Sequence, residues 1–267
     1  MTRNSPFAPW IQKPTVETTT FKTVYEQDSI GIDEILRWAQ IATLNPSRDP
    51  QHFVPGEGSY AKETDLESAA QATEARFSPN VVFLEMKGPD FPPLSFYDLP
   101  GIFAIAEMKG DDYLVDVVEN LTRKYVNHEK AIIMLALPMD HDIDNSRALR
   151  IIRDSNAEDR TIGILTKADR VDLDLQDKVA YWLTVLQGKR QTVGHGFFTT
   201  SLPPNVEPQA LKAYEESFFR TGAQWPRAFD EFVNRCGVDE LRVHVRKQLG
   251  EAFTSRYDSD NLNPGSL

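Results

Sequence analysis

The sequence has a single cysteine, Cys236, a shortage of positive charge and no long apolar run. One cysteine excludes an internal disulfide and is typical of a reducing compartment. The longest strongly apolar stretch, 131–138, is far shorter than the roughly 20 residues that span a bilayer, and residues 1–20 lack the apolar core of a signal peptide. The net charge of −11, from 29 Lys and Arg against 40 Asp and Glu, disfavours nucleic acid as a partner. We therefore expect a cytoplasmic protein.

The chain nevertheless has ample material for a core. Hydrophobic residues make up 40% and aromatic residues 10% of its 267 residues, which excludes disorder and allows one large domain or a domain with an appendage. Strand-like and helical patterns alternate from residue 81 to 200, which predicts a layered α/β fold with a mainly parallel sheet. The predicted strands are 18–25, 81–87, 94–98, 131–137, 161–166 and 196–200. The predicted helices are 32–44, 62–75, 111–128, 146–155, 173–186, 208–219, 225–236 and 238–256, and 45–60 is predicted to be a surface loop.

Two of the predicted strands, 131–137 and 161–166, are apolar throughout, as strands buried on both faces are. In a parallel sheet, ligands bind beyond the carboxyl ends of the strands, so the residues that end each strand carry the most information. Strand 94–98 leads into DLPG at 98–101, of the form DxxG, and strand 161–166 leads into TKAD at 166–169, of the form TKxD. A DxxG is expected about once by chance in a chain of this length, and a TKxD in roughly one chain in twenty.

These residue types suit a guanine nucleotide. Asp98 can hold a magnesium ion through water beside the phosphates, and Gly101 lets a backbone amide approach the γ-phosphate. The carboxylate of Asp169 can accept hydrogen bonds from N1–H and the exocyclic amine of guanine, a pattern that adenine does not offer. The aliphatic stem of Lys167 can cover the purine face. The structural alternative for Lys167 and Asp169 is a surface ion pair and a helix N-cap, and for Asp98 it is an ordinary turn aspartate.

Longer segments resemble the GTPase domain of the dynamin superfamily, particularly the large dynamin-like GTPases of fungi. FSPNVVFLEMKGPDFPPLSFYDLPGIF at 77–103 resembles the family's path into switch II, and RTIGILTKADRVD at 160–172 resembles its guanine-specificity segment. IDEILRWAQIATLNPS at 32–47 is similar to an insert of the fungal members. Phe218-Phe219 and Arg235-Cys236-Gly237 resemble the domain's exit into a helical neck, and the likeness spans residues 7–256.

The resemblance implies a P-loop-GTPase-like three-layer sandwich with GTP and Mg²⁺ bound, in which Asp98, Gly101, Thr166, Lys167 and Asp169 contact the nucleotide or its metal. It further implies GTP hydrolysis linked to membrane remodelling or organelle fission, and assembly into homo- or hetero-oligomers of dynamin-like proteins. Association with the cytoskeleton is implied by the family alone. Because the chain shows no basic patch, we expect contact with organelle membranes to be indirect. The implied domains are a partial G domain at 1–236, the start of a neck at 237–257 and a frayed tail at 258–267.

One element of the family is missing from the sequence. No GxxxxGK[ST] string occurs, and no switch I segment is recognisable. Phosphoryl transfer depends on positioning and charge neutralisation, so we expect a truncated member with impaired catalysis and assign no catalytic residue. The alternative is a non-hydrolysing interaction module that pairs with intact dynamin-like GTPases. The absence of the string favours this alternative for the chain as printed.

Two further patterns resemble ligand-binding motifs but lack part of what those motifs need. GEGSYA at 56–61 fits a dinucleotide-binding pattern but follows a Pro-rich loop instead of a strand. DHDID at 140–144 resembles the start of a calcium loop but lacks the glycine and the glutamate that such a loop needs at its sixth and twelfth positions. We interpret 140–144 as a solvated loop.

Overall fold

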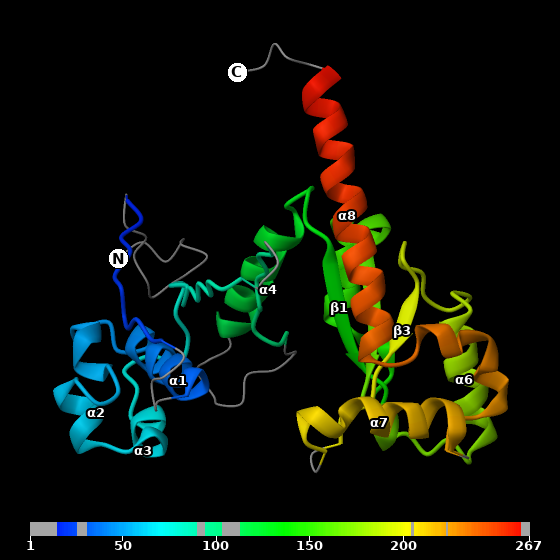
Figure 1. Ribbon diagram of the computed structural model, residues 1–267, viewed down its shortest axis with the longest axis horizontal. Coiled ribbons are helices and arrows are strands. Elements are labelled where there is room, and N and C mark those ends of the chain that lie inside the picture. The colour runs from blue at the N-terminus through cyan, green and yellow to red at the C-terminus, as the bar shows by residue number, and fades with distance from the viewer. Residues whose placement is uncertain are drawn as a thin grey trace. The chain divides into compact units, whose positions relative to one another are not determined.

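The structure is a computed structural model that describes residues 15–25, 31–89, 94–102, 113–203, 206–222 and 224–262 (Figure 1). The chain divides into two compact units. The first comprises residues 1–99 and 106–117, and the second comprises residues 100–105 and 118–267. We describe each unit by itself. Within the described residues, no helix is both long and apolar enough to cross a membrane.

The first unit is built from short helices around a small apolar cluster. Its helices are α1 (Ile32–Thr43), a 3₁₀ turn at Pro50–Phe53, α2 (Ser59–Glu63) and α3 (Leu66–Gln71), followed by the start of α4 (Tyr113–Val126). Trp38 and Ile41 of α1 pack with Phe53 and Ala69, and the ring of Tyr60 closes the cluster edge-on to Phe53. The helix predicted from residue 32 is confirmed, and it ends before Asn45 as predicted.

Five predicted elements of this unit were wrong: one loop, one helix and three strands. The supposed surface loop 45–60 contains Phe53 and Val54, which are 0% and 1% exposed, and the 3₁₀ turn places Phe53 in the cluster. The helix predicted at 62–75 is two short helices, because Asp65 caps the second by accepting from the amide of Ser68 at 2.9 Å. The predicted strands 18–25, 81–87 and 94–98 have no regular secondary structure.

The second unit contains a three-stranded parallel sheet in the order β1-β2-β3. Its strands are β1 (Ile133–Pro138), β2 (Thr161–Thr166) and β3 (Phe197–Thr199). The register pairs Ile133 with Thr161 and Gly163 with Phe197. Gly163 is required at its position because any Cβ there would clash with the ring of Phe197. The predicted α/β class with a parallel sheet is therefore confirmed.

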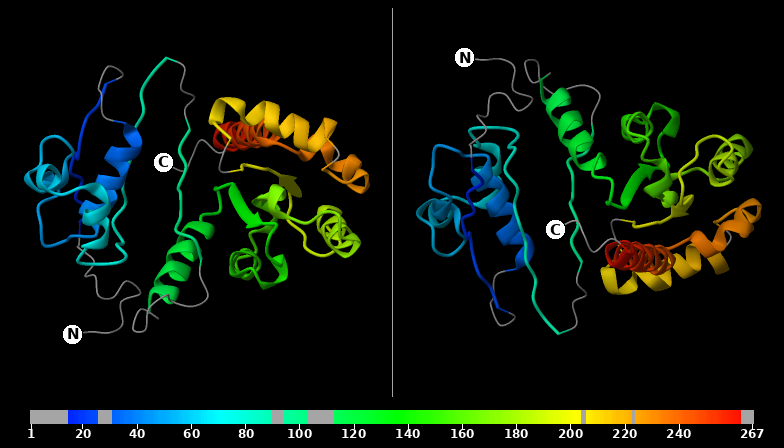
Figure 2. Two further views of the ribbon diagram at one scale, coloured as in Figure 1. Left: turned by 90° about the horizontal axis from the view of Figure 1, so that it is seen from below. Right: turned by 90° about the horizontal axis from the view of Figure 1, so that it is seen from above.

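Helices cover both faces of this sheet. On one face Leu135, Leu165 and Phe197 pack against α5 (Arg147–Asp154) and α6 (Gln176–Leu186), where Trp182 is 2% exposed. On the other face the side chains of α8 (Val238–Leu262) pack against β2 and β3, with Leu241 against Ile162, Ile164 and Phe198. Figure 2 shows α6 and α8 on opposite sides of the strands.

Strands β1 and β2, both predicted to be buried on both faces, differ in their burial. Strand β2 is buried on both faces except at Thr166, which confirms the prediction. In β1 the burial alternates, and Met134 is 52% exposed. The prediction of two buried faces was wrong for β1, because α8 lies over β2 and β3 and leaves this side of β1 uncovered.

The elements described after β3 are all helical. It comprises α7 (Leu211–Glu216), a π turn at Ser217–Thr221, a 3₁₀ segment at Arg227–Arg235 and α8. Figure 1 shows α8 extending beyond the strands, and a Cβ added at Gly250 meets nothing within 4 Å. The helix predicted at 238–256 is present and extends to Leu262. Its role as a neck stays a prediction, as do the domain bounds 1–236, 237–257 and 258–267.

Candidate functional site

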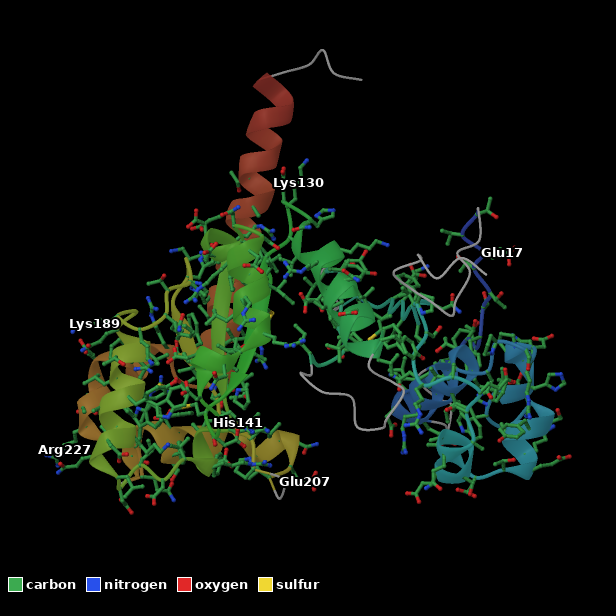
Figure 3. All side chains as sticks on the ribbon, turned by 180° about the vertical axis from the view of Figure 1, so that it is seen from behind. Glu17, Lys130, His141, Lys189, Glu207 and Arg227 are labelled. Carbon is green, nitrogen blue, oxygen red and sulfur yellow. The ribbon has the colours of Figure 1, made fainter. Side chains whose placement is uncertain are left out.

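The candidate site lies at the carboxyl edge of the parallel sheet. The three strands end there at Pro138, Thr166 and Thr199. In Figure 3 the labelled His141, just beyond β1, marks this edge, and Lys130, just before β1, marks the opposite one. Thr166 is fixed by its carbonyl, which accepts from the amide of Met139 at 2.9 Å. The TKAD motif therefore begins at a firmly paired strand end, as the sequence predicts.

Lys167 has a left-handed backbone, with φ 59° and ψ 40°. A residue with a Cβ adopts this conformation at a cost of about 1 kcal/mol, and such strain is concentrated at functional sites. The turn at Lys167 leads into the 3₁₀ segment Ala168–Arg170, and the amide of Ala168 donates to the carbonyl of Thr200 at 3.3 Å. The motif is thereby joined to the chain that follows β3.

Asp140 is the main charge partner of this turn. Its carboxylate lies 3.7 Å from Nζ of Lys167 and 3.9 Å from a guanidinium nitrogen of Arg170. The pKa of Asp140 is lowered, chiefly by the hydrogen bond from Nδ1 of His141 at 2.7 Å and then by the charge of Lys167. The loop 140–144 thus supplies a counter-ion to the motif, a role that its resemblance to a calcium loop did not indicate.

The carboxylate of Asp169 is oriented by a serine 32 residues later. The hydroxyl of Ser201 donates to Oδ1 of Asp169 at 2.7 Å. Ser201 is 0% exposed, and its own amide donates to Oε1 of Glu215 at 3.2 Å. The capping interpretation of Asp169 does not describe this contact. Sequence reasoning missed the pairing of Ser201 with Asp169 and missed Glu215, since no local pattern marks contacts between residues so far apart in the chain.

Asp98 and Gly101 lie in a segment without regular secondary structure. Asp98 is exposed, and a Cβ added at Gly101 meets nothing within 4 Å. The strand expected to present Asp98 is absent. The structure places Thr166, Lys167 and Asp169 in one turn at the end of β2, and the roles of Asp98 and Gly101 stay predictions. The described residues contain no cluster of three His, Cys, Asp or Glu side chains that could hold a metal ion.

A hollow among the described residues lies away from the TKAD turn. It has a volume of about 710 Å³ and is lined by the segment from Leu186 to Phe197 together with Glu231, Phe232 and Arg235. None of the predicted site residues lines it. This hollow is at the amino end of β3, whereas the TKAD turn is at the carboxyl edge.

Known proteins that are similar to this chain show its family. A sequence profile described as the dynamin family matches residues 35–168, half of the chain. The chain is 34% identical over 216 residues to interferon-induced GTP-binding protein Mx1 of Bos taurus, a match that covers 75% of this chain and 33% of that protein. It is 38% identical to the Mx1 of Ovis aries over 64% of this chain and 28% of that protein.

Plant proteins match over a similar region. The chain is 26% identical over 201 residues to phragmoplastin DRP1A of Arabidopsis thaliana, covering 73% of this chain and 31% of that protein. The chain thus spans about a third of the length of the curated relatives that it matches. The profile match, the relatives and the TKAD turn at the carboxyl edge of a parallel sheet agree, and the chain belongs to the dynamin family.

Proposed function

We propose that this chain binds guanine nucleotides through the TKAD turn and is part of a dynamin-like GTPase. The observation that supports this most directly is the pair of Asp169 and Ser201, in which a serine hydroxyl at 2.7 Å directs a carboxylate at the edge of the sheet. A carboxylate accepts from both N1–H and the amine of guanine, and an adenine ring does not present two such donors side by side. The relatives named GTP-binding proteins support the same choice of base.

Lys167 and the nucleotide's own metal complete the proposed site. The left-handed backbone of Lys167 starts the turn, and its side chain is 42% exposed, which leaves its stem able to cover a purine. Mg²⁺ is bound in such sites through one or two carboxylates together with the phosphates. Asp98 would supply a carboxylate contact through water, and Gly101 would allow a γ-phosphate to approach the backbone; the metal itself would arrive with the nucleotide.

A change of base preference tests this proposal. In Asp169→Asn the amide nitrogen can donate to the C2 carbonyl of xanthine, whereas it opposes the amine of guanine. We expect this variant to lose at least about tenfold in GDP affinity and to gain affinity for xanthosine diphosphate, measured by calorimetry with magnesium. Asp174→Asn, an exposed neighbour, is the matched control and should bind like the wild type. No heat with GDP at ~1 mM for the wild-type chain would refute the proposal.

GTP hydrolysis and membrane remodelling are further parts of the proposal, beyond nucleotide binding. We infer that the intact family architecture couples GTP hydrolysis to self-assembly at organelle membranes, with this chain contributing base recognition. Phosphate release by the purified chain tests the first step, because catalysis of phosphoryl transfer requires the phosphates to be positioned and neutralised. Sustained release of phosphate would show that the chain contains a complete catalytic site.

A second candidate function follows from the absence of GxxxxGK[ST] in the printed sequence. In that case the chain would bind to intact dynamin-like GTPases without hydrolysing GTP itself. Mixing the chain with an intact relative distinguishes the two functions. A change in the relative's rate of phosphate release, with none from this chain alone, would favour the interaction module.

A further inference from the structure

Glu215 carries a buried carboxylate that the proposed base contact does not itself use. It is 6% exposed, near the end of α7, and among the described residues it forms no ion pair. Burial raises the pKa of Glu215, while two backbone amides that donate to it act in the opposite direction. A buried ionisable side chain is costly unless its acceptor atoms are satisfied. Here both oxygens are occupied, one by each amide.

The two amides belong to different parts of the second unit. Oε1 accepts from the amide of Ser201 at 3.2 Å, in the loop that follows β3. Oε2 accepts from the amide of Val238 at 2.7 Å, at the first residue of α8. One carboxylate therefore joins the serine that contacts Asp169 to the start of the helix that covers the sheet.

The backbone around Glu215 is built for this arrangement. Gly237 has φ +99°, and a Cβ added to it would lie 3.2 Å from Oε2 of Glu215. The amide of Gly237 donates to the carbonyl of Thr199 at 2.8 Å, and Thr199 also forms a parallel bridge with Cys236. A glycine at 237 lets the chain turn into α8 while its amides face β3 and Glu215.

We propose that Glu215 is a positioning residue for guanine recognition, which holds Ser201, and through it Asp169, in register with the first turn of α8. This inference rests on the proposed function. A carboxylate is required because both of its oxygens accept, whereas a glutamine in the same place has one acceptor and would direct its NH₂ group at an amide. Glu215→Gln therefore breaks one of the two contacts while preserving the size of the side chain.

The test compares two nucleotides on the full chain. Inosine diphosphate lacks the exocyclic amine, so the ratio of GDP to inosine diphosphate affinity reports how well Asp169 meets that amine. We expect Glu215→Gln to lower GDP affinity about tenfold and to bring the ratio close to one. Glu216→Gln is the matched control, because Glu216 adjoins Glu215, is 53% exposed at its side chain and pairs with Arg220 at 2.8 Å. It should leave the ratio unchanged.

The ratio separates positioning from a purely structural role. A Glu215→Gln chain that melts earlier but keeps the wild-type ratio would overturn the inference and leave the proposed function standing. If the wild-type chain binds no GDP, both are overturned. Ser201→Ala should lower the ratio as well, and the double variant should be no worse than the more impaired single variant, because both act through one contact.

Hydrogen exchange on the wild-type chain provides a readout that does not depend on the folding of a variant. The amides of Ser201 and Val238 donate to the same carboxylate. We expect GDP to slow the exchange of both amides together. Slowing at Ser201 with no change at Val238 would overturn the link to α8.

Discussion

The two motif-bearing segments, 94–102 and 161–169, differ in what surrounds them. Strand β2 has β1 on one side and β3 on the other, and five of its six residues are buried. In the other segment Leu94 is 53% and Phe96 80% exposed, and the residues form no strand. Both segments have apolar residues that favour a strand. Of the two, only 161–166 is paired with neighbouring strands, β1 and β3.

An apolar strand-like pattern in the sequence predicts a strand only where a neighbouring strand is available to pair with it. An extended segment leaves its amides and carbonyls to water until another strand or a covering layer takes them up. Residues 161–166 are paired with a strand at each edge and are covered on both faces. The TKAD motif therefore begins at the end of a fixed strand. Residues 94–98 form no strand in the structure, and Asp98 follows an exposed stretch of chain.

The largest expected contrast is in the reactivity of two thiols, one in the core beside β3 and one in the exposed segment 94–102. Cys236 is 1% exposed, and burial raises its pKa to about 12. The thiolate is the reactive form, so the shift from an ordinary cysteine implies a reaction with iodoacetamide at pH 8 that is roughly a thousandfold slower. Phe96→Cys places a thiol in the exposed segment and should react at the ordinary rate. Mass spectrometry would distinguish the two sites, and comparable rates would remove the contrast.

Glycine substitutions sharpen the comparison on stability. Gly163→Ala forces a Cβ into the ring of Phe197 within the sheet, and overpacking of this kind costs about 1–3 kcal/mol. Gly101→Ala adds a Cβ to open space and should change stability by less than about 0.5 kcal/mol. Urea unfolding monitored by circular dichroism measures both. A Gly101 variant as unstable as the Gly163 variant would mean that the space around Gly101 is not open.

A smaller effect probes the loop beside the site. The hydroxyl of Tyr181 donates to Oδ1 of Asp142 at 2.6 Å and accepts from the amide of Ile143 at 3.2 Å. Tyr181→Phe should lower stability by roughly 1–2 kcal/mol at neutral pH, because both contacts are lost. If the variant is as stable as the wild type at pH 8, the loop is held by other contacts.

The contact between Tyr181 and Asp142 also predicts a dependence of stability on pH. Burial and the hydrogen bond to Asp142 raise the pKa of Tyr181 from 10.0 to about 12. Since the folded chain holds this proton more tightly than the unfolded chain, the contribution of Tyr181 is fully present below pH 10 and is lost as the pH rises toward 12. The stability difference between the wild type and Tyr181→Phe should therefore shrink between pH 8 and pH 11.

Several elements were predictable because their signals are local. The apolar run 161–166, the helix that begins after Ser146 and the helix that begins after Gly237 all appear near their predicted bounds. Ser146 caps its helix by accepting from the amide of Leu149 at 3.3 Å, as an N-terminal serine does. Strand-end motifs could also be placed, because every parallel strand directs its carboxyl end to the same edge.

Other features depend on contacts between distant residues. The pairing of Asp169 with Ser201 and the link from Glu215 to Val238 join positions 32 and 23 apart in the chain. The interpretation of 140–144 as a solvated loop overlooked Asp140 as the counter-ion of Lys167, because that contact exists only when β1 and β2 lie side by side. No periodic pattern in the sequence indicates that these residues are in contact.

The sequence by itself determined the α/β class, the buried character of strand 161–166, the TKAD motif and the resemblance to the dynamin family. Those features depend on residue type and on spacing within a dozen residues. Only the tertiary structure decided that 94–98 forms no strand, that Lys167 turns with a left-handed backbone and that Glu215 supports Ser201. Each of these depends on which backbone groups find partners, and that is set by the path of the whole chain.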